Sequence, residues 1–180
     1  LLTDVDGDGR KDVVITNGIL RRPNNLDYLN FISADSAQQA LRTSKDGFEQ
    51  LIKQMPEGRV SNFFFRNEGE MKFSDKSAEW IEKKTNYSNG MAIADFDRDG
   101  DPDYVINHLN AEASLIRNNS IEDYDGKFLK VNLSYQGANT KGIGSKVIVY
   151  GSSGVQLQEL YNSRGWCSSS DFPLIFGLGN

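Results

Sequence analysis

The side chains best suited to chemistry in this sequence are aspartates concentrated in two short segments. Nine of the sixteen aspartates lie in residues 4–12 (DVDGDGRKD), here called loop 1, and residues 95–103 (DFDRDGDPD), called loop 2. Both segments read D-x-D-x-D-G-x-x-D. Alternate carboxylates in a tight turn can face one concavity, and the glycine after the third aspartate permits the positive φ that wraps the backbone around it.

Each loop predicts a cation site made only of oxygen ligands. The side chains at positions 1, 3, 5 and 9 and the main-chain carbonyl at position 7 supply roughly six or seven oxygens, which suits Ca²⁺ better than Mg²⁺ or a transition metal. The predicted ligands are Asp4, Asp6, Asp8, Arg10 and Asp12 in loop 1, and Asp95, Asp97, Asp99, Asp101 and Asp103 in loop 2. Because position 7 contributes its carbonyl, we expect the Asp101 side chain to point outward.

The alternative is that both loops are solvated polar turns, since aspartate and glycine are common in turns. Against this, four or five carboxylates within nine residues repel one another unless a cation neutralises them. We therefore favour two Ca²⁺ sites. We expect the more acidic loop 2 to bind more tightly, because loop 1 lies where a chain end frays.

The residues after each loop indicate strands rather than the helix that follows an EF-hand or dockerin loop. Val13-Val14-Ile15 and Tyr104-Val105-Ile106 are β-branched and aromatic, and residues 91–94 form another strand candidate before loop 2. Each loop is thus predicted to be the turn of a β-hairpin.

An Arg-Asn pair, here called the Arg-Asn marker, follows each loop: Arg66-Asn67 after loop 1 and Arg117-Asn118 after loop 2. Its distance from the loop differs between the two. Asn67 lies 63 positions after Asp4, whereas Asn118 lies only 23 after Asp95. The first repeat therefore carries an insertion, about residues 21–56, whose apolar spacing predicts a helical hairpin covering one edge of a sheet. Internal repetition of this kind is typical of a repeat architecture.

The tail predicts a small β domain. Leu129, Val131, Leu133 and Tyr135 alternate as in a strand, residues 146–150 form a second strand, and Val155 and Leu157 indicate a third. We expect a compact β-sandwich or barrel packed against the repeat region.

Composition excludes several classes of protein. The single cysteine and single histidine exclude a disulfide framework and argue against a Cys- or His-based metal centre or a Ser–His–Asp triad. A net charge of −5 argues against nucleic acid as a partner. No apolar run is long enough to span a membrane, and the abrupt start at Leu1 leads us to expect a fragment or processed product.

Residues 65–80 (FRNEGEMKFSDKSAEW) followed by residues 89–107 (NGMAIADFDRDGDPDYVIN) resemble the FG-GAP/VCBS repeat of integrin-α-like β-propellers. In that family each blade carries such a calcium loop between two strands. The resemblance implies a mainly β fold, a partial β-propeller with a helical insertion. Propellers of the family have about seven blades, whereas this chain supplies two loops.

Residues 129–150 and 158–179 resemble the ASPIC/UnbV domain, which often follows FG-GAP repeats, as in cartilage acidic protein and bacterial surface proteins. The matching marks are Asn139, Gly142-Ile143-Gly144, Arg164-Gly165, Ser168 and the final FGLG. We therefore expect a repeat region in residues 1–122 and an ASPIC/UnbV-like β domain in residues 123–180.

The resemblances imply a non-enzymatic, calcium-binding adhesion module that is extracellular, on the cell surface or periplasmic, with a protein or glycan partner. The alternative is a non-catalytic or catalytic fragment of a calcium-dependent carbohydrate-active enzyme. Arg164, Trp166 and Ser168 could form a sugar pocket with an aromatic floor, although a structural turn with a buried Trp166 is the simpler interpretation. Cys167 is expected to be a buried free thiol, and His108 a surface or partly buried side chain rather than a catalyst.

Overall fold

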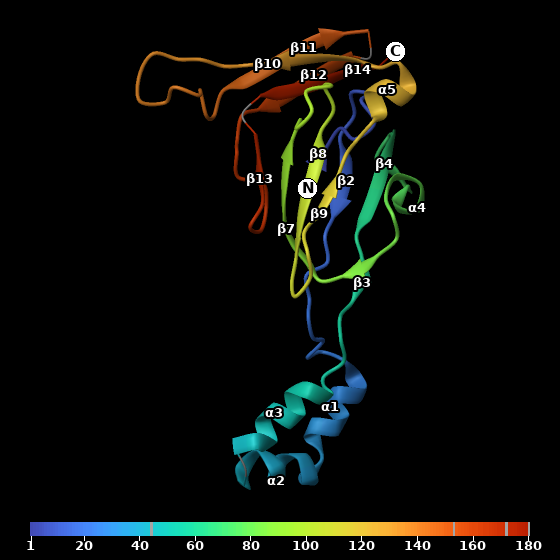
Figure 1. The fold of residues 1–180 in the computed structure, drawn as a ribbon, viewed down its shortest axis with the longest axis vertical. Helices are drawn as coiled ribbons and strands as arrows, with labels where there is room; N and C mark the ends of the chain where they lie inside the picture. Colours follow the sequence, from blue (N-terminus) through green and yellow to red (C-terminus); the bar gives the residue numbers. More distant parts are fainter. Residues whose placement is uncertain (44, 153, 172, 180) are drawn as a thin grey trace.

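The computed structural model of the chain describes residues 1–43, 45–152, 154–171 and 173–179, and Figure 1 shows its layout. The fold is mainly β, as predicted. The repeat region forms two four-stranded sheets, the second of which includes one strand, β13, from the C-terminal part of the chain. The first has the order β1 (Leu2–Thr3), β2 (Asp12–Ile15), β4 (Phe63–Gly69) and β5 (Lys72–Asp75); the second has the order β13 (Ser169–Ser170), β7 (Ser88–Ala94), β8 (Asp103–His108) and β9 (Ser114–Ile116).

Loops 1 and 2 are the turns of hairpins in these sheets, as the sequence predicts. Strands β1 and β2 pair antiparallel with Thr3 opposite Asp12, and β7 and β8 pair with Ala94 opposite Asp103. The loops therefore begin and end at matched positions of their two hairpins.

The two sheets share one apolar core, because alternate residues of their strands face each other across the interface. Phe64 of the first sheet meets Tyr104 of the second edge-to-face, with ring centroids 5.6 Å apart. The fully or nearly buried members of this core are Val5, Val14, Phe64, Met91, Tyr104 and Ile106. Packing of this core fixes the position of both loops at one end of the sheets.

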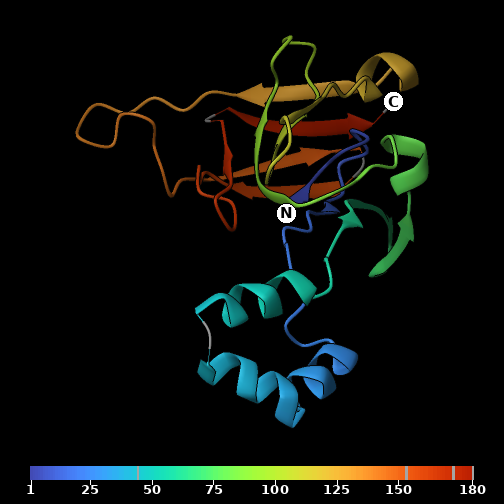
Figure 2. The same ribbon diagram turned by 60° about the horizontal axis from the view of Figure 1, so that its bottom comes forward.

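The insertion forms three helices, α1 (Leu26–Ser33), α2 (Asp35–Thr43) and α3 (Lys45–Gln54). Figures 1 and 2 show that they stand away from the sheets at the end opposite the C-terminal β domain. The expectation of a helical hairpin covering a sheet edge is thus wrong. The insertion is joined to the sheets by a narrow neck in which the Arg22 N–H donates to the Pro56 carbonyl at 2.9 Å. Beyond this neck, β3 (Val60–Ser61) pairs with β6 (Thr85–Asn86).

The C-terminal β domain consists of two antiparallel pairs that enclose a second small core. Strand β10 (Lys127–Val131) pairs with β14 (Leu174–Gly179), and β11 (Lys146–Gly151) pairs with β12 (Gly154–Glu159). Leu160, Leu174 and Phe176 are buried between the pairs. Strand β10 ends before Tyr135, which is exposed, so the predicted strand is too long at that end.

The C-terminal domain and the second sheet are physically joined. Strand β13 lies parallel to β7, with Ser169 opposite Ala92, and the Asp171 N–H donates to the Ile93 carbonyl at 2.9 Å. The four main strands of the domain lie across the end of the sheets where the loops are (Figure 1). Two short helices, α4 (Ser77–Trp80) and α5 (Ser120–Tyr124), flank this end. Within the described part of the chain, no helix combines the length and the apolar character needed to cross a bilayer.

Candidate metal centre

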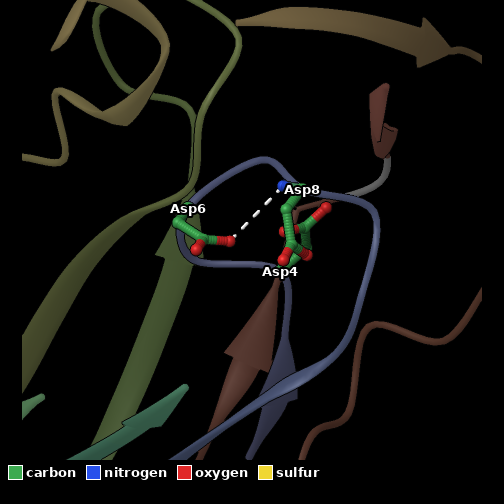
Figure 3. Close-up of side chains that lie close together, drawn as sticks. All are labelled: Asp4, Asp6 and Asp8. Atoms are coloured by element: carbon green, nitrogen blue, oxygen red, sulfur yellow. Dashed lines mark hydrogen bonds between the residues drawn. The ribbon is translucent and has the colours of Figure 1, made fainter. Parts of the chain in front are cut away.

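Loop 1 brings its first three aspartates together. Oxygens of Asp4, Asp6 and Asp8 lie within 4.8 Å of one another, and Figure 3 shows the three carboxylates facing the space enclosed by the turn. The turn is held by the Gly9 N–H, which donates to Asp4 Oδ2 at 3.0 Å. Gly9 has a φ of +90°, which a residue with a side chain adopts only with strain. The predicted concavity therefore exists.

Loop 2 repeats this arrangement with Asp95, Asp97 and Asp99, whose oxygens also lie within 4.8 Å. Its Gly100, with a φ of +105°, stands where loop 1 has Gly9. At the fourth position Arg98 adopts a φ of +69°, which costs a non-glycine residue about 1 kcal/mol. Loop 2 therefore has the same turn as loop 1 although a non-glycine residue occupies this strained position.

The aspartate at position 9 closes each loop through the backbone. Asp12 accepts hydrogen bonds from Asn67 N–H and Val5 N–H, both at 2.8 Å. Asp103 does the same with Asn118 N–H and Phe96 N–H, both at 2.9 Å. These two aspartates lie outside the gathered triplets. That they bind a cation, and that the carbonyls of Arg10 and Asp101 do so, stay predictions.

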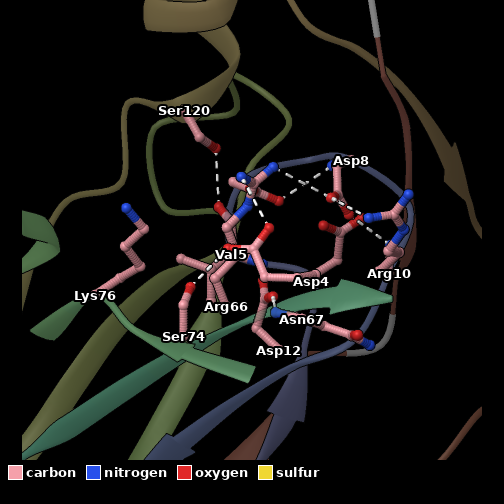
Figure 4. Close-up of polar contacts among 12 residues, drawn as sticks. Asp4, Val5, Asp8, Arg10, Asp12, Arg66, Asn67, Ser74, Lys76 and Ser120 are labelled. Carbon is pink, nitrogen blue, oxygen red and sulfur yellow. Dashed lines mark hydrogen bonds and ion pairs between the residues drawn. The ribbon is translucent and has the colours of Figure 1, made fainter. Parts of the chain in front are cut away.

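The Arg-Asn marker supplies a cationic side chain to each cluster. Arg66 Nε lies 2.6 Å from Asp6 Oδ2, and its Nη2 lies 3.4 Å from Asp8 Oδ2. In loop 2, Arg117 pairs with Asp97 and, at 3.3 Å, with Asp99. Figure 4 shows Arg66 among the loop 1 carboxylates. The sequence showed that Arg-Asn is repeated but not that its arginine pairs with the loop. The fact that the marker follows an acidic loop in both repeats could have suggested this pairing.

The first aspartate of each loop carries an oxygen without a hydrogen-bond partner. Asp4 and Asp95 each keep a buried Oδ1 for which the described residues offer no donor. Burial, with repulsion from Asp8 and Asp12, raises the pKa of Asp4 to about 7. A buried carboxylate oxygen left unpaired is costly, and a hard cation is the group that oxygen-only clusters of this kind prefer. The residues present therefore fit Ca²⁺.

The side chain of Asp101 is not directed outward, contrary to our expectation. Asp101 is only 1% exposed, and its Oδ2 accepts hydrogen bonds from Ser120 Oγ at 3.2 Å and Ile121 N–H at 3.1 Å. Burial raises its pKa to about 7. The sequence could not reveal this, because Ser120 and Ile121 reach Asp101 only through the packing of α5 against loop 2.

The C-terminal domain completes the surroundings of both loops. Lys130 Nζ of β10 lies 2.8 Å from Asp95 Oδ2, and the Gly179 N–H of β14 donates to the Gly7 carbonyl at 3.1 Å. A Cβ at Gly177 would overlap Asp4 Oδ2, so the two backbones approach closely at this point. A cavity of about 310 Å³ between the loops and this domain is lined by Asp4, Asp95 and Asp101 among others. Both predicted sites thus lie at a domain interface.

Loop 1 is also not at a frayed end. The amino group of Leu1 donates to the Val14 carbonyl at 2.8 Å, and Asp4 is only 6% exposed. The premise on which we expected weaker binding in loop 1 is therefore wrong.

Arg164, Trp166 and Ser168 do not converge on one pocket. Arg164 lines the cavity beside the loops, whereas Trp166 is 81% exposed and is absent from that lining. Ser168 Oγ donates to the Trp166 carbonyl and accepts from Met91 N–H, which ties this turn to β7. The expectations of a buried Trp166 and of a buried thiol at Cys167 are both wrong, since Cys167 is exposed as well.

His108 is buried between two serines, not at the surface or partly buried as expected. Its Nδ1 lies 3.0 Å from Ser88 Oγ and its Nε2 lies 2.7 Å from Ser114 Oγ. Both Ser88 and His108 are less than a tenth exposed. The histidine therefore links β7, β8 and β9 inside the sheet.

Comparison with protein families agrees with this architecture. Residues 4–106, more than half of the chain, match the FG-GAP-like repeat family, and residues 135–180 match the ASPIC and UnbV family. Among curated proteins no match was found. FG-GAP repeat proteins are typically extracellular or at the cell surface, and their repeats often bind Ca²⁺. Both acidic loops lie within the matched residues, and the chain belongs to the FG-GAP-like repeat family.

Proposed function

We propose that this chain is a calcium-stabilised, non-enzymatic binding module of an extracellular, cell-surface or periplasmic protein. The observation that carries the proposal is the pair of buried, unpartnered oxygens, Asp4 Oδ1 and Asp95 Oδ1, each at the head of a triplet of carboxylates within the described residues. The same arrangement in two separate hairpins argues against chance.

Calcium has a structural task in this proposal. Asp4, Asp6 and Asp8 would hold one ion and Asp95, Asp97 and Asp99 the other. Arg66 and Arg117 each pair with two of the three carboxylates in their loop. A bound ion would supply positive charge to all three. Because the loops lie against the C-terminal domain, their order also supports the interface.

The absence of catalysis is part of the proposal, and the position of His108 supports it. A general base must reach a proton of the substrate, and His108 is enclosed between Ser88 and Ser114. Ser88 is only 1% exposed, so the Ser88–His108 pair is poorly placed to attack a substrate. Hydrolytic activity lost in His108→Ala, with folding intact, would contradict this part of the proposal.

The calcium sites can be tested by thermal unfolding in EDTA and in millimolar Ca²⁺. A ligand that binds only the native state at 100 times its Kd stabilises the protein by about 2.7 kcal/mol per site. We expect Ca²⁺ to raise the Tm of the wild type, and Asp6→Ala and Asp97→Ala each to lose part of that rise. Glu70→Ala, an exposed turn residue of the β4–β5 hairpin, is the matched control and should keep the full rise. The same Tm with and without Ca²⁺ would show that the loops are solvated turns.

The partner is proposed to be an extracellular protein or a glycan. A screen against glycans and matrix proteins, run with and without EDTA, tests this. Binding that requires Ca²⁺ would support a surface organised by the loops. Binding unaffected by EDTA would place the partner surface elsewhere on the chain.

A further inference from the structure

A third group of carboxylates lies beside loop 2. Oxygens of Asp99, Asp101 and Glu122 lie within 4.8 Å of one another. Asp99 belongs to the predicted site in loop 2, Asp101 was expected to offer only its carbonyl, and Glu122 lies in α5, outside both repeats of the motif. Neither the D-x-D-x-D-G-x-x-D pattern nor the marker that follows it predicts this group.

Asp101 shows the same feature as the first aspartate of each loop. Its Oδ2 is held by Ser120 and Ile121, while its Oδ1 is buried and without a hydrogen-bond donor among the described residues. Asp4 and Asp95 likewise have Oδ2 held, by Gly9 and Lys130, and Oδ1 unpaired. Asp101 is 1% exposed, and a buried carboxylate oxygen without a partner is costly unless a cation or a donor satisfies it.

From these two observations we propose that Asp99, Asp101 and Glu122 bind a second Ca²⁺ beside the ion of loop 2, which gives the chain three calcium sites. The proposal extends the proposed function, because Asp99 would then be shared by two ions.

The charges around loop 2 support an additional cation. Loop 2 contributes five carboxylates and α5 a sixth to this group: Asp95, Asp97, Asp99, Asp101, Asp103 and Glu122. Among the described residues, two cationic side chains contact this group, Arg117 and Lys130. One divalent ion leaves this group negative, and a second brings it close to neutral.

Loop 1 is the natural comparison, because it has Arg10 at the position of Asp101. Arg10 lies 3.9 Å from Asp8, and Lys11 lowers the pKa of Asp4 against the larger effect of burial. Loop 1 thus provides positive charge from its own sequence where loop 2 provides a carboxylate. We expect no second ion at loop 1.

The ligands also indicate how strongly the ion binds. Glu122 pairs with Arg117 through Oε1 at 2.8 Å, and one of its carboxylate oxygens lies within 4.8 Å of oxygens of Asp99 and Asp101. Three carboxylates offer at most six oxygens, and the Glu122 side chain is 47% exposed, so water would complete the six to eight ligands that Ca²⁺ takes. An open site with a shared ligand binds more weakly than a closed one, so we expect this ion to bind last in a titration.

The experiment is a count of bound Ca²⁺ by equilibrium dialysis of the full chain, with Ca²⁺ alone as the probe. We expect three ions for the wild type, and two for both Glu122→Gln and Asp101→Asn. Asp123→Asn is the matched control, since it removes one charge from the same helix outside the group, and it should keep three. Asp101 has no contact with Arg117 among those described, so the same loss in both variants cannot come from disturbing Arg117.

The outcomes separate this proposal from the proposed function. Two ions in the wild type, unchanged in Glu122→Gln but reduced by Asp6→Ala and by Asp97→Ala, would overturn the third site and leave the loop sites intact. No bound ion in the wild type would overturn both. If Asp101→Asn fails to fold, the ion count of Glu122→Gln tests the third site. Glu122 lies on the surface, so the circular dichroism spectrum of this variant should match that of the wild type.

Discussion

At the scale of single residues, aspartates of identical chemistry perform different tasks according to their surroundings. Asp4 and Asp95 are buried with one oxygen unpaired among the described residues, which prepares them as ligands. Asp12 and Asp103 use both oxygens to hold backbone N–H groups. All four are aspartates of the same motif, but burial and hydrogen bonding distinguish the two with an unpaired oxygen from the two that hold the backbone of the turn.

Buried carboxylates make the stability of the calcium-free protein depend on pH. The pKa values of Asp4 and Asp101 are raised to about 7 and that of Asp12 to about 6, in each case mainly by burial. Between pH 4 and 7 the folded state therefore binds more protons than the unfolded state, so the free energy of unfolding falls as pH rises. Each pKa unit corresponds to about 1.4 kcal/mol, and we expect a loss of a few kcal/mol between pH 5 and pH 8.

Urea unfolding of the calcium-free protein at several pH values measures this loss. Asp4→Asn, which resembles the protonated acid at every pH, should flatten the trend. Saturating Ca²⁺ should reverse it, because the ion replaces the protons. A calcium-free protein that gains stability from pH 5 to pH 8 would contradict the raised pKa values.

At the scale of elements, strands far apart in the sequence position the predicted ligands. Strands β1, β2, β7 and β8 hold the ends of the two loops, and their pairing follows from local alternation of apolar residues. The covering strands β10 and β14 come from the other domain. They place Lys130 against Asp95 and the backbone of Gly179 against Gly7. Each loop thus depends on both domains.

The pair Lys130–Asp95 should link calcium binding to the docking of the C-terminal domain. The Asp95 side chain is 3% exposed, so loss of Lys130 leaves a buried carboxylate with less compensation. We expect Lys130→Met to destabilise the protein in EDTA by about 2 kcal/mol, the range for a hydrogen bond to a charged group. The cost should be smaller in Ca²⁺, because the ion offsets the charge of Asp95.

Lys127→Met is the control, since Lys127 lies on the same strand and faces solvent. Urea unfolding measures stability, and hydrogen exchange of β10 and β14 reports docking. Equal effects of the two substitutions, or an equal cost of Lys130→Met with and without Ca²⁺, would show that the pair does not link the domains to the ion.

At the scale of the whole molecule, the sheets, the loops and the C-terminal domain form one body from which the helical insertion projects (Figure 1). The insertion has its own contacts, such as the Tyr28 hydroxyl donating to the Leu51 carbonyl at 3.1 Å. Its ends meet at the neck, where Gly58 N–H donates to the Leu20 carbonyl at 3.1 Å. Loops 1 and 2 lie at the far end of the sheets.

Removal of the insertion should therefore leave the calcium response unchanged. We expect a variant in which residues 23–55 are replaced by a two-residue Asn-Gly turn to fold, because the residues that flank the cut are already paired as in a hairpin. Its rise in Tm with Ca²⁺ should equal that of the wild type. A lost or halved rise would show that the helices support the loops through the neck.

The sequence by itself determined the features that depend on neighbouring residues. Hairpins around two acidic turns follow from the alternation of β-branched residues on either side of D-x-D-x-D-G-x-x-D, and the gathering of three carboxylates follows from the turn itself. The position of the insertion followed from the unequal spacing of Asn67 and Asn118. These features rest on contacts within about ten residues or on a direct repeat of sequence.

Only the tertiary structure decided which residues from elsewhere reach the loops. Glu122 and Lys130 carry no mark in the sequence, and Asp101 lies in the motif at a position where it was expected to face solvent. Their contacts depend on how α5 and β10 pack. Packing is driven by the burial of apolar surface, which is non-directional, so the sequence does not show which distant residues come together. The same reason explains why Trp166 and Cys167, expected to be buried from their residue types, are exposed: their turn lies outside both apolar cores.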